Sequence, residues 1–204
     1  MQRIRGSIAI FGIVTVLSGL TPIVQPVMAT PILVVQKTFQ EFIQSGLGKY
    51  RDGDYKGAIA DYDQAILLNP NIPEIYILRG NAFYDQGDMK TAIKDYDKAL
   101  TLNPKYDVAY VERGNARDDL GDREGAIADY NQAISINPNL PDAYSNRAIT
   151  YIRMKNKKAA IADLEKAADL FQKQGNIMGY NRTKKILERL EKTEGDKKDE
   201  GSDR

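Results

Sequence analysis

The adjacent carboxylates of Asp118 and Asp119 are the residues of this chain whose types and spacing best suit chemistry. Two neighbouring carboxylates can raise each other's pKa or gather a cation. The ordinary alternative is a solvated helix end just before Gly121. The chain has no histidine and no cysteine, so the commonest general base, the thiol nucleophile and the soft metal ligands are all missing. We therefore expect no catalysis, no cofactor and no bound metal, and an enzyme acting through this acidic pair is the least favoured hypothesis.

A period of 34 residues organises the chain around this pair. The recurring positions are prolines, alanines and tyrosines: Pro70, Pro104 and Pro138; Ala58, Ala92, Ala126 and Ala160; Ala65, Ala99, Ala133 and Ala167; Tyr62, Tyr96 and Tyr130. Leu164 stands at the tyrosine position in the fourth copy. A sequence that copies itself at this interval forms stacked units, each of which buries its apolar face against its neighbours.

Each unit contains the signals of two helices joined by a tight turn. Pro73 can open a helix, because its missing N–H would be unpaired there in any case. Gly87 can adopt the left-handed conformation that ends this helix, and Asp88 can cap the next one. The second helix stops before Pro104. The same turn recurs at Gly53-Asp54 and Gly121-Asp122, and as Lys155-Asn156 in the fourth copy.

Three further repeated positions predict how the helices pack. Small residues in register mark close approaches, and we expect each to face an alanine of the second helix: Gly46, Gly80, Gly114 and Ala148. Aromatic residues are expected to fill the space between units: Phe42, Tyr76, Tyr110 and Tyr144. Arginines precede three of the small residues, at Arg79, Arg113 and Arg147, and aspartates recur on the second helices, at Asp61, Asp95, Asp129 and Asp163. We predict buried Arg–Asp pairs between adjacent helices; the alternative is arginines whose charges stay in water.

This pattern resembles the tetratricopeptide repeat (TPR) family over residues 37–171. The resemblance implies an all-α fold, a right-handed superhelix of about four helix-turn-helix repeats. Apolar residues between Phe171 and Leu190 predict a C-terminal capping helix within residues 172–192, which a repeat stack needs to remain soluble. Residues 193–204 are charged and lack apolar side chains, so we expect a disordered tail.

The first 29 residues have the composition of a signal peptide. Arg3 and Arg5 precede an apolar run that Pro22 interrupts, and small residues lead to a cleavage site after Ala29. The alternative is an uncleaved membrane anchor, and residues 30–36 form a short linker in either case. We expect an exported protein of a periplasm or thylakoid-type lumen. The formal net charge is +1, or −1 without residues 1–29, so we expect no nucleic-acid partner.

In this family the first helix of each pair lines a concave groove, so the resemblance places the partner-binding surface there. Projection of the helical period gives the inward residues Ile43, Leu47, Tyr50, Ile77, Asn81, Tyr84, Val111, Asn115, Asp118, Ser145, Ile149 and Ile152. Apolar side chains alternate with amides in this set. The mixture suits an extended peptide, whose backbone pairs with the amides and whose side chains enter apolar pockets.

Some members of the family clamp the acidic C-terminus of chaperones with lysines and asparagines. The matching positions here are Ile77, Asn81, Glu112, Asp142 and Asn146, and their acidic members would repel a carboxylate. A second register, on the first three repeats, has no match. We therefore predict that this chain does not bind the chaperone carboxylate and prefers a neutral or basic segment.

The leading hypothesis is an exported adaptor or scaffold that binds a protein or peptide in its groove. The repeated Arg-Gly and Ala-Ile-Ala-Asp-Tyr segments loosely resemble exported TPR proteins of cyanobacterial type. That resemblance implies an assembly helper for membrane complexes. The alternative is a membrane-anchored structural element that associates with itself.

Overall fold

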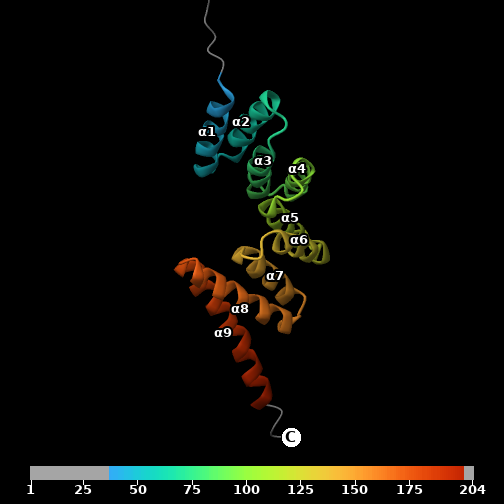
Figure 1. Ribbon diagram of the computed structural model, residues 1–204, viewed down its shortest axis with the longest axis vertical. Helices are drawn as coiled ribbons and strands as arrows, with labels where there is room; N and C mark the ends of the chain where they lie inside the picture. The colour runs from blue at the N-terminus through green and yellow to red at the C-terminus, as the bar shows by residue number, and fades with distance from the viewer. Residues whose placement is uncertain (1–36, 200–204) are drawn as a thin grey trace, which may run out of the picture. The chain divides into compact units, whose positions relative to one another are not determined.

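The structure, a computed structural model, describes residues 37–199, and these residues form helices joined by short turns without any strand (Figure 1). The helices are α1 (Phe39–Arg51), α2 (Tyr55–Leu68), α3 (Pro73–Asp85), α4 (Met89–Leu102), α5 (Asp107–Asp119), α6 (Arg123–Ile136), α7 (Pro141–Arg153), α8 (Lys157–Lys173) and α9 (Ile177–Asp199). The predictions of a signal peptide, an anchor and a linker fall on residues 1–36, outside the described part.

The helices pack as four hairpins in chain order, followed by α9. The most extensive contacts join α1 to α2, α3 to α4, α5 to α6 and α7 to α8, and each hairpin then contacts the next. The final helix, α9, packs on α8. This arrangement confirms the predicted all-α superhelix of about four repeats with a capping helix. Within the described residues, no helix is both long enough and apolar enough to span a membrane.

The turn inside each hairpin follows the pattern expected from the sequence. Gly53, Gly87 and Gly121 have φ values of +79°, +94° and +89°, a region that suits a residue without a Cβ. The following aspartate caps the second helix; Asp88, for example, accepts a hydrogen bond from Thr91 N at 3.1 Å. In the fourth hairpin Lys155 takes the left-handed conformation, with φ of 61°, and Asn156 is the cap.

The close approach within each hairpin differs from the prediction. A Cβ added to Gly46, Gly80 or Gly114 would lie 2.5–2.7 Å from the Cε1 atom of a tyrosine on the second helix. The three tyrosines are Tyr62, Tyr96 and Tyr130. The expectation that these small residues face alanines was therefore wrong. The helical projection identified the right face of the second helix, but the bulky ring, and not the neighbouring alanine, reaches across to the glycine.

The fourth hairpin solves the same packing problem with two different side chains. Ala148 replaces the glycine and Leu164 replaces the tyrosine, and both are fully buried in one apolar cluster. Alanine is larger than glycine and leucine is smaller than tyrosine, so the total side-chain volume is balanced and the hairpin interior stays filled.

The predicted Arg–Asp pairs are present in three hairpins. Arg113 donates from Nε and Nη2 to the carboxylate of Asp129 at 2.9 and 2.6 Å, and Arg79 and Arg147 make the same bidentate contact with Asp95 and Asp163. The aspartates are buried, and the arginine side chains are 15–20% exposed. The alternative of arginines with fully hydrated charges is therefore excluded.

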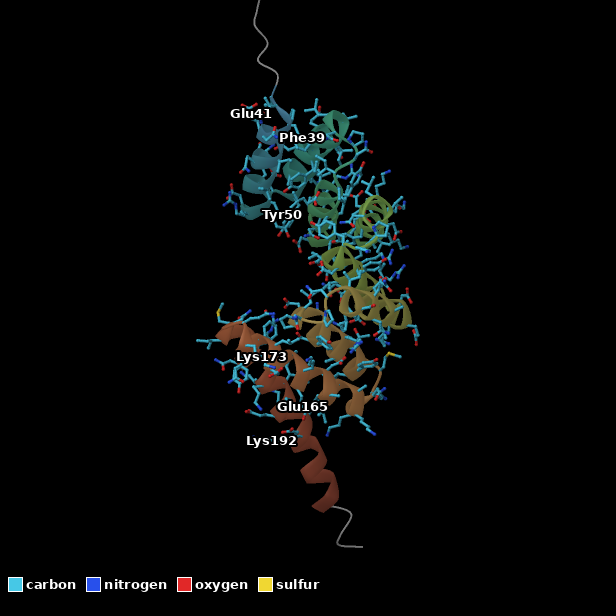
Figure 2. All side chains as sticks on the ribbon, viewed as in Figure 1. Phe39, Glu41, Tyr50, Glu165, Lys173 and Lys192 are labelled. Atoms are coloured by element: carbon cyan, nitrogen blue, oxygen red, sulfur yellow. The ribbon has the colours of Figure 1, made fainter. Side chains whose placement is uncertain are left out.

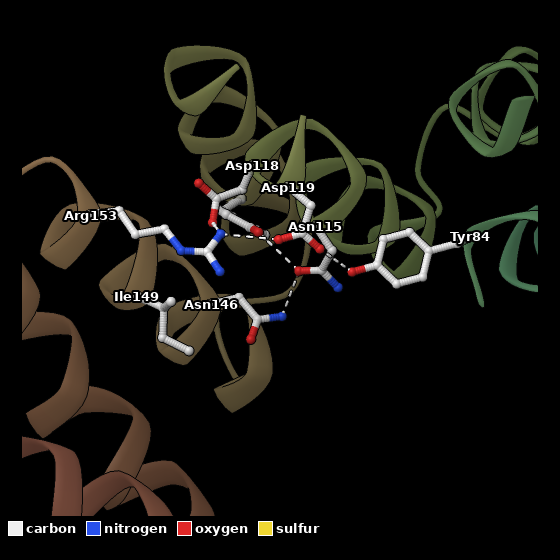
Figure 3. Close-up of a pocket in the computed structure, with 8 residues that line it drawn as sticks. Tyr84, Asn115, Asp118, Asp119, Asn146, Ile149 and Arg153 are labelled. Carbon is white, nitrogen blue, oxygen red and sulfur yellow. Dashed lines mark hydrogen bonds and ion pairs between the residues drawn. The ribbon is translucent and has the colours of Figure 1, made fainter. Parts of the chain in front are cut away.

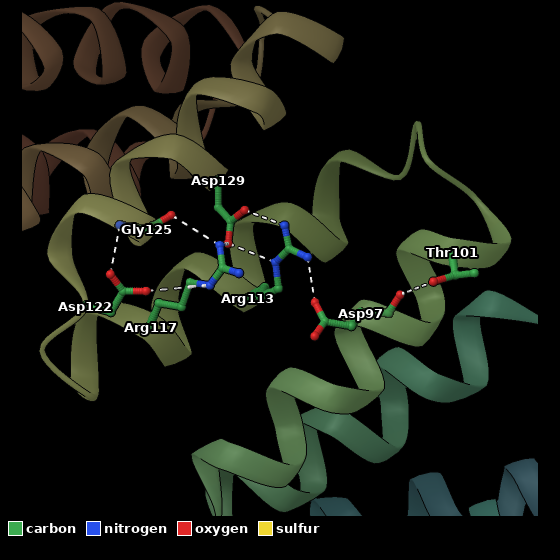
Figure 4. A network of polar contacts seen from close by, with 7 residues as sticks. All are labelled: Asp97, Thr101, Arg113, Arg117, Asp122, Gly125 and Asp129. Atoms are coloured by element: carbon green, nitrogen blue, oxygen red, sulfur yellow. Dashed lines mark hydrogen bonds and ion pairs between the residues drawn. The ribbon is translucent and has the colours of Figure 1, made fainter.

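Each of these arginines also reaches back to the preceding hairpin. Arg113 Nη1 lies 2.6 Å from Asp97 Oδ1 on α4 (Figure 4). Arg79 Nη1 lies 2.5 Å from Asp63 Oδ1 on α2. Arg147 makes the equivalent contact with the amide oxygen of Asn131. One guanidinium therefore joins three helices, which suits its planar set of five donors.

The first hairpin uses a lysine in a different place. Ser45 occupies the arginine position, and Lys49 Nζ, one helical turn later, lies 2.7 Å from Asp61 Oδ2. The third hairpin has cations at both positions, because Arg117 also contacts Asp129, at 2.8 Å.

The last helix is longer than expected. α9 continues to Asp199, so residues 193–199, which we expected to be a disordered tail, are helical. Extending a formed helix adds one hydrogen bond for each residue that is fixed, and the segment contains no proline. Gly175, with φ of +70°, and the cap Asn176 repeat the hairpin turn just before α9.

Candidate functional site

Two adjacent cavities lie along the first helices of the middle repeats. The first has a volume of about 240 Å³ and the second about 330 Å³. The first is lined by Tyr84, Asn115, Asp118, Asp119, Tyr130, Asn146, Ile149 and Arg153, which are drawn in Figure 3. The second is lined by Val108, Val111, Glu112, Asn115, Leu140, Asp142, Asn146 and Arg182. Asn115 and Asn146 belong to both, so the two cavities form one site.

Asn115 connects three helices at the boundary of the cavities. Its Oδ1 accepts hydrogen bonds from Tyr130 Oη and from Asn146 Nδ2, both at 2.9 Å, and its Nδ2 donates to Glu112 Oε2 at 3.3 Å. The two amides are therefore held in fixed orientations. The Oδ1 atom of Asn146 accepts no hydrogen bond within the described residues and remains available to a ligand.

The acidic pair of the first cavity is occupied by an arginine of the same chain. Arg153, at the end of α7, contacts Asp118 Oδ2, and its Nη1 lies 3.1 Å from Asp119 Oδ1 (Figure 3). Asp118 is only 7% exposed. The solvated helix end considered for this pair is therefore wrong for Asp118, and the guanidinium supplies the positive charge that the two carboxylates could gather.

Hydrogen bonds to aspartates link the first helices of the earlier repeats in a similar way. The hydroxyl of Tyr50 donates to Asp85, and the hydroxyl of Tyr84 donates to Asp119. Tyr50 is labelled at the end of α1 in Figure 2. Burial and the adjacent carboxylate raise the pKa of both tyrosines, so both hydroxyls remain protonated donors at neutral pH. The Arg153–Asp118 contact is the third link, with the acidic residue now on the earlier helix.

The second cavity combines apolar walls with two carboxylates. Val108, Val111 and Leu140 supply the apolar surface. Burial raises the pKa of Glu112, and the negative charge of Asp142 raises it further, although the hydrogen bond from Asn115 acts in the opposite direction. Within the described residues neither carboxylate forms an ion pair, and neither does Arg182, which also lines this cavity.

Five of the twelve predicted site residues line these cavities: Tyr84, Val111, Asn115, Asp118 and Ile149. Five others are half-buried and line neither cavity: Ile43, Leu47, Tyr50, Asn81 and Ile152. The last two are packing residues. Ile77 belongs to the core, and the buried hydroxyl of Ser145 donates to Pro141 O at 2.7 Å.

The residues that line the cavities coincide only in part with the predicted stripe. On α7 they are Asp142, Asn146, Ile149 and Arg153, and the equivalent positions on α5 are Val108, Glu112, Asn115 and Asp119. The projection missed this because one residue along a helix turns the side chain by about 100°. The sequence did contain a signal for these positions, because the residues that line the cavities include amides and charged side chains, which are rare in the buried core.

Family models match most of the repeat region. A model described as "TPR repeat" matches residues 46–87 and 114–155. Two models described as "Tetratricopeptide repeat" match residues 73–106 and 141–174. Together these matches cover more than half of the chain. No protein of curated function matches the sequence.

Solved structures similar to this one are repeat proteins as well. MamA is 26% identical with a TM-score of 0.61, and the match covers 76% of this chain and 86% of that one. The TPR domain of Arabidopsis OM64 is 26% identical with a TM-score of 0.55, over 56% of this chain and 95% of that one. The first TPR of Spaghetti (RPAP3), bound to the HSP90 peptide SRMEEVD, is 26% identical with a TM-score of 0.55, over 57% and 93%.

Proposed function

Because the chain belongs to the tetratricopeptide repeat family, a family of protein-interaction scaffolds, we propose that it is an adaptor that binds an extended segment of a partner protein in the two cavities of α3, α5 and α7. The similar Spaghetti (RPAP3) domain holds a peptide, which supports a protein partner here. The mechanism is preorganisation, since a rigid site loses little conformational entropy on binding.

The observation that carries this proposal is the fixed pair of amides between the cavities. Asn115 and Asn146 are held by hydrogen bonds to Tyr130, to Glu112 and to each other. An extended peptide presents backbone N–H groups at regular intervals, and the free Oδ1 of Asn146 can accept one of them. Apolar side chains of the peptide can then contact Ile149.

The charge of the site favours a neutral or basic segment. The HSP90 peptide bound to Spaghetti (RPAP3), SRMEEVD, is acidic, whereas Glu112 and Asp142 add negative charge to this site. An acidic tail would meet like charges in the second cavity. The proposed partner is therefore not a chaperone C-terminal carboxylate.

The proposed location is outside the cytoplasm, in a periplasm or thylakoid-type lumen, where the protein would help to assemble membrane complexes. Residues 1–29 support this through their composition: two arginines, an apolar run, and a small residue at position 29. The second candidate is a membrane-anchored element that associates with itself, which requires that these residues are retained. The mass of the mature chain separates the two, because the adaptor begins at Thr30.

The test is crosslinking of the full chain in its native host, followed by mass spectrometry of the bait and of the captured proteins. The variant Asn146→Ala/Ile149→Ala removes an amide and an apolar contact from the site. The control Gln132→Ala changes an exposed residue of α6 outside both cavities. We expect one partner that the control retains and the double variant loses. An uncleaved bait that captures only its own copies would refute the adaptor and support the self-associating element.

A further inference from the structure

We propose that the second cavity binds a lysine or arginine side chain of the partner segment, between the carboxylates of Glu112 on α5 and Asp142 on α7. This inference rests on the proposed function and adds the identity of one recognised side chain. It is carried by the difference between the two cavities in how their charges are paired.

Each cavity is lined by two carboxylates and one arginine. In the first, Arg153 contacts both Asp118 and Asp119, so the chain neutralises its own acidic pair. In the second, the only hydrogen bond to a carboxylate from within residues 37–199 is the one that Asn115 donates to Glu112, at 3.3 Å. A half-buried carboxylate that no cation contacts is unfavourable, and a cation from a partner would relieve that cost.

The two carboxylates are close enough to act together. Glu112 and Asp142 line the same cavity, from two helices that contact each other, so their charges interact. Asp142 is exposed and lies in the first turn of α7. A cation in the cavity would therefore contact one exposed and one half-buried carboxylate.

The remaining walls suit the stem of a long basic side chain. Val108, Val111 and Leu140 are apolar, and Val108 is 39% exposed. Lysine and arginine bury their methylene groups on such surfaces while their charged ends reach polar groups. The cavity volume of about 330 Å³ accommodates one such side chain. A small metal ion would use neither the apolar walls nor this volume.

Arg182 sets a limit on the proposed recognition. It lines the same cavity from α9, and it forms no ion pair within the described residues. Its charge repels an incoming cation, so the cavity admits a basic side chain less tightly than the two carboxylates alone would. Replacement of Arg182 by glutamine should therefore tighten the binding of a basic peptide.

The first part of the test selects peptides from a random nonapeptide phage library on the immobilised full chain. The site variant is Glu112→Gln/Asp142→Asn. The matched control, Glu124→Gln/Asp52→Asn, makes the same change in charge at two exposed residues outside the cavities. We expect the wild type and the control to enrich peptides with a lysine or arginine next to apolar residues, and the site variant to lose that enrichment. Thermal unfolding checks that each variant is folded.

The second part measures affinity by fluorescence polarisation with a selected peptide whose basic residue is kept or replaced by norleucine. We expect about tenfold tighter binding of the basic form by the wild type, a ratio near one for the site variant, and a larger ratio for Arg182→Gln.

The outcomes separate the two proposals. If no peptide is enriched by any folded protein, the proposed groove function is refuted. If peptides are enriched without basic residues, or if the site variant keeps the tenfold ratio, the groove function stands and the basic cavity is refuted.

Discussion

Arg147 on α7 donates from Nε and Nη2 to the two carboxylate oxygens of Asp163 on α8, both at 2.7 Å. These hydrogen bonds raise the pKa of the guanidinium, which stays charged. No other cation contacts Asp163 within the described residues. Asp129, at the same position one repeat earlier, is contacted by both Arg113 and Arg117.

This difference predicts unequal effects of equivalent substitutions. Arg147→Met should lower the free energy of unfolding by about 3 kcal/mol, because it leaves a buried carboxylate without a partner. Arg113→Met should cost less, since Arg117 Nη1 remains 2.8 Å from Asp129 Oδ2. Urea unfolding followed by circular dichroism measures both. The double variant Arg113→Met/Arg117→Met should lose as much stability as Arg147→Met does. Equal losses for Arg113→Met and Arg147→Met would contradict a compensating role for Arg117.

The tyrosine hydroxyls of the hairpins should also differ in how much they contribute to stability. Tyr96 donates to Asn81 Oδ1 at 2.8 Å. The buried hydroxyl of Tyr62 has no partner in the described part of the chain, because Leu47 stands at the asparagine position. Tyr96→Phe should cost about 1 kcal/mol, and Tyr62→Phe should be neutral or stabilising. Thermal unfolding of the two variants provides the comparison. A clear loss of stability in Tyr62→Phe would show that its hydroxyl is hydrogen-bonded in solution.

Glu112 should weaken the fold at neutral pH. Burial raises its pKa in the folded state, so its contribution to stability is present below the usual glutamate pKa of about 4.3 and is lost as the pH rises through the raised value. Glu112→Gln keeps a neutral acceptor for Asn115 and should raise the Tm at pH 7. This gain in Tm should shrink near pH 4, where the protonated Glu112 of the wild type is neutral, as the glutamine of the variant is.

A Tm gain that is the same at pH 4 and pH 7 would contradict a role for ionisation. The groups that face Glu112 are Asp142 and Asp85, whose charges raise its pKa, Asn115, whose hydrogen bond lowers it, and Arg182 across the cavity. Because the same substitution should weaken the binding of basic peptides, the cavity would exchange stability for recognition.

The hairpin packing predicts that two substitutions compensate each other. A Cβ at position 114 would lie 2.7 Å from Tyr130 Cε1, so Gly114→Ala should cost about 1–3 kcal/mol despite the better helix propensity of alanine. In the background of Tyr130→Leu, which reproduces the Ala148–Leu164 pair, the same change should cost much less. Urea unfolding of the four proteins gives the coupling energy, and strict additivity would refute the compensation.

The helices and the ion pairs within each hairpin could be predicted well from the sequence, because their signals are local. Gly87 and Asp88 end one helix and begin the next through their own backbone and side chain. The Arg79–Asp95 pair could be predicted for a similar reason, since both residues lie in one hairpin. The second partner, Asp63, could not, because it depends on how neighbouring hairpins stack.

The candidate site was only partly predictable. The helical period gives a face to within about one residue, and the cavity lies on the edge of the predicted face. Arg153 could not be predicted from the repeat, because the residue at the equivalent position of the third repeat is Asp119, which has the opposite charge. Arg182 lies on α9, outside the period, so the repeat pattern carried no information about it.

The replacement of the glycine–tyrosine pair by an alanine–leucine pair in the fourth hairpin limits which duplications and recombinations of the gene would preserve the packing. Duplication of a whole hairpin carries both members of the pair together and preserves the fit. Recombination within a hairpin that joins α7 to α6 would set Ala148 against Tyr130, the close approach that Gly114 avoids. The heritable unit of this protein is therefore the hairpin, and crossovers should be tolerated in the turns before prolines 73 and 141 rather than in the Gly-Asp turns.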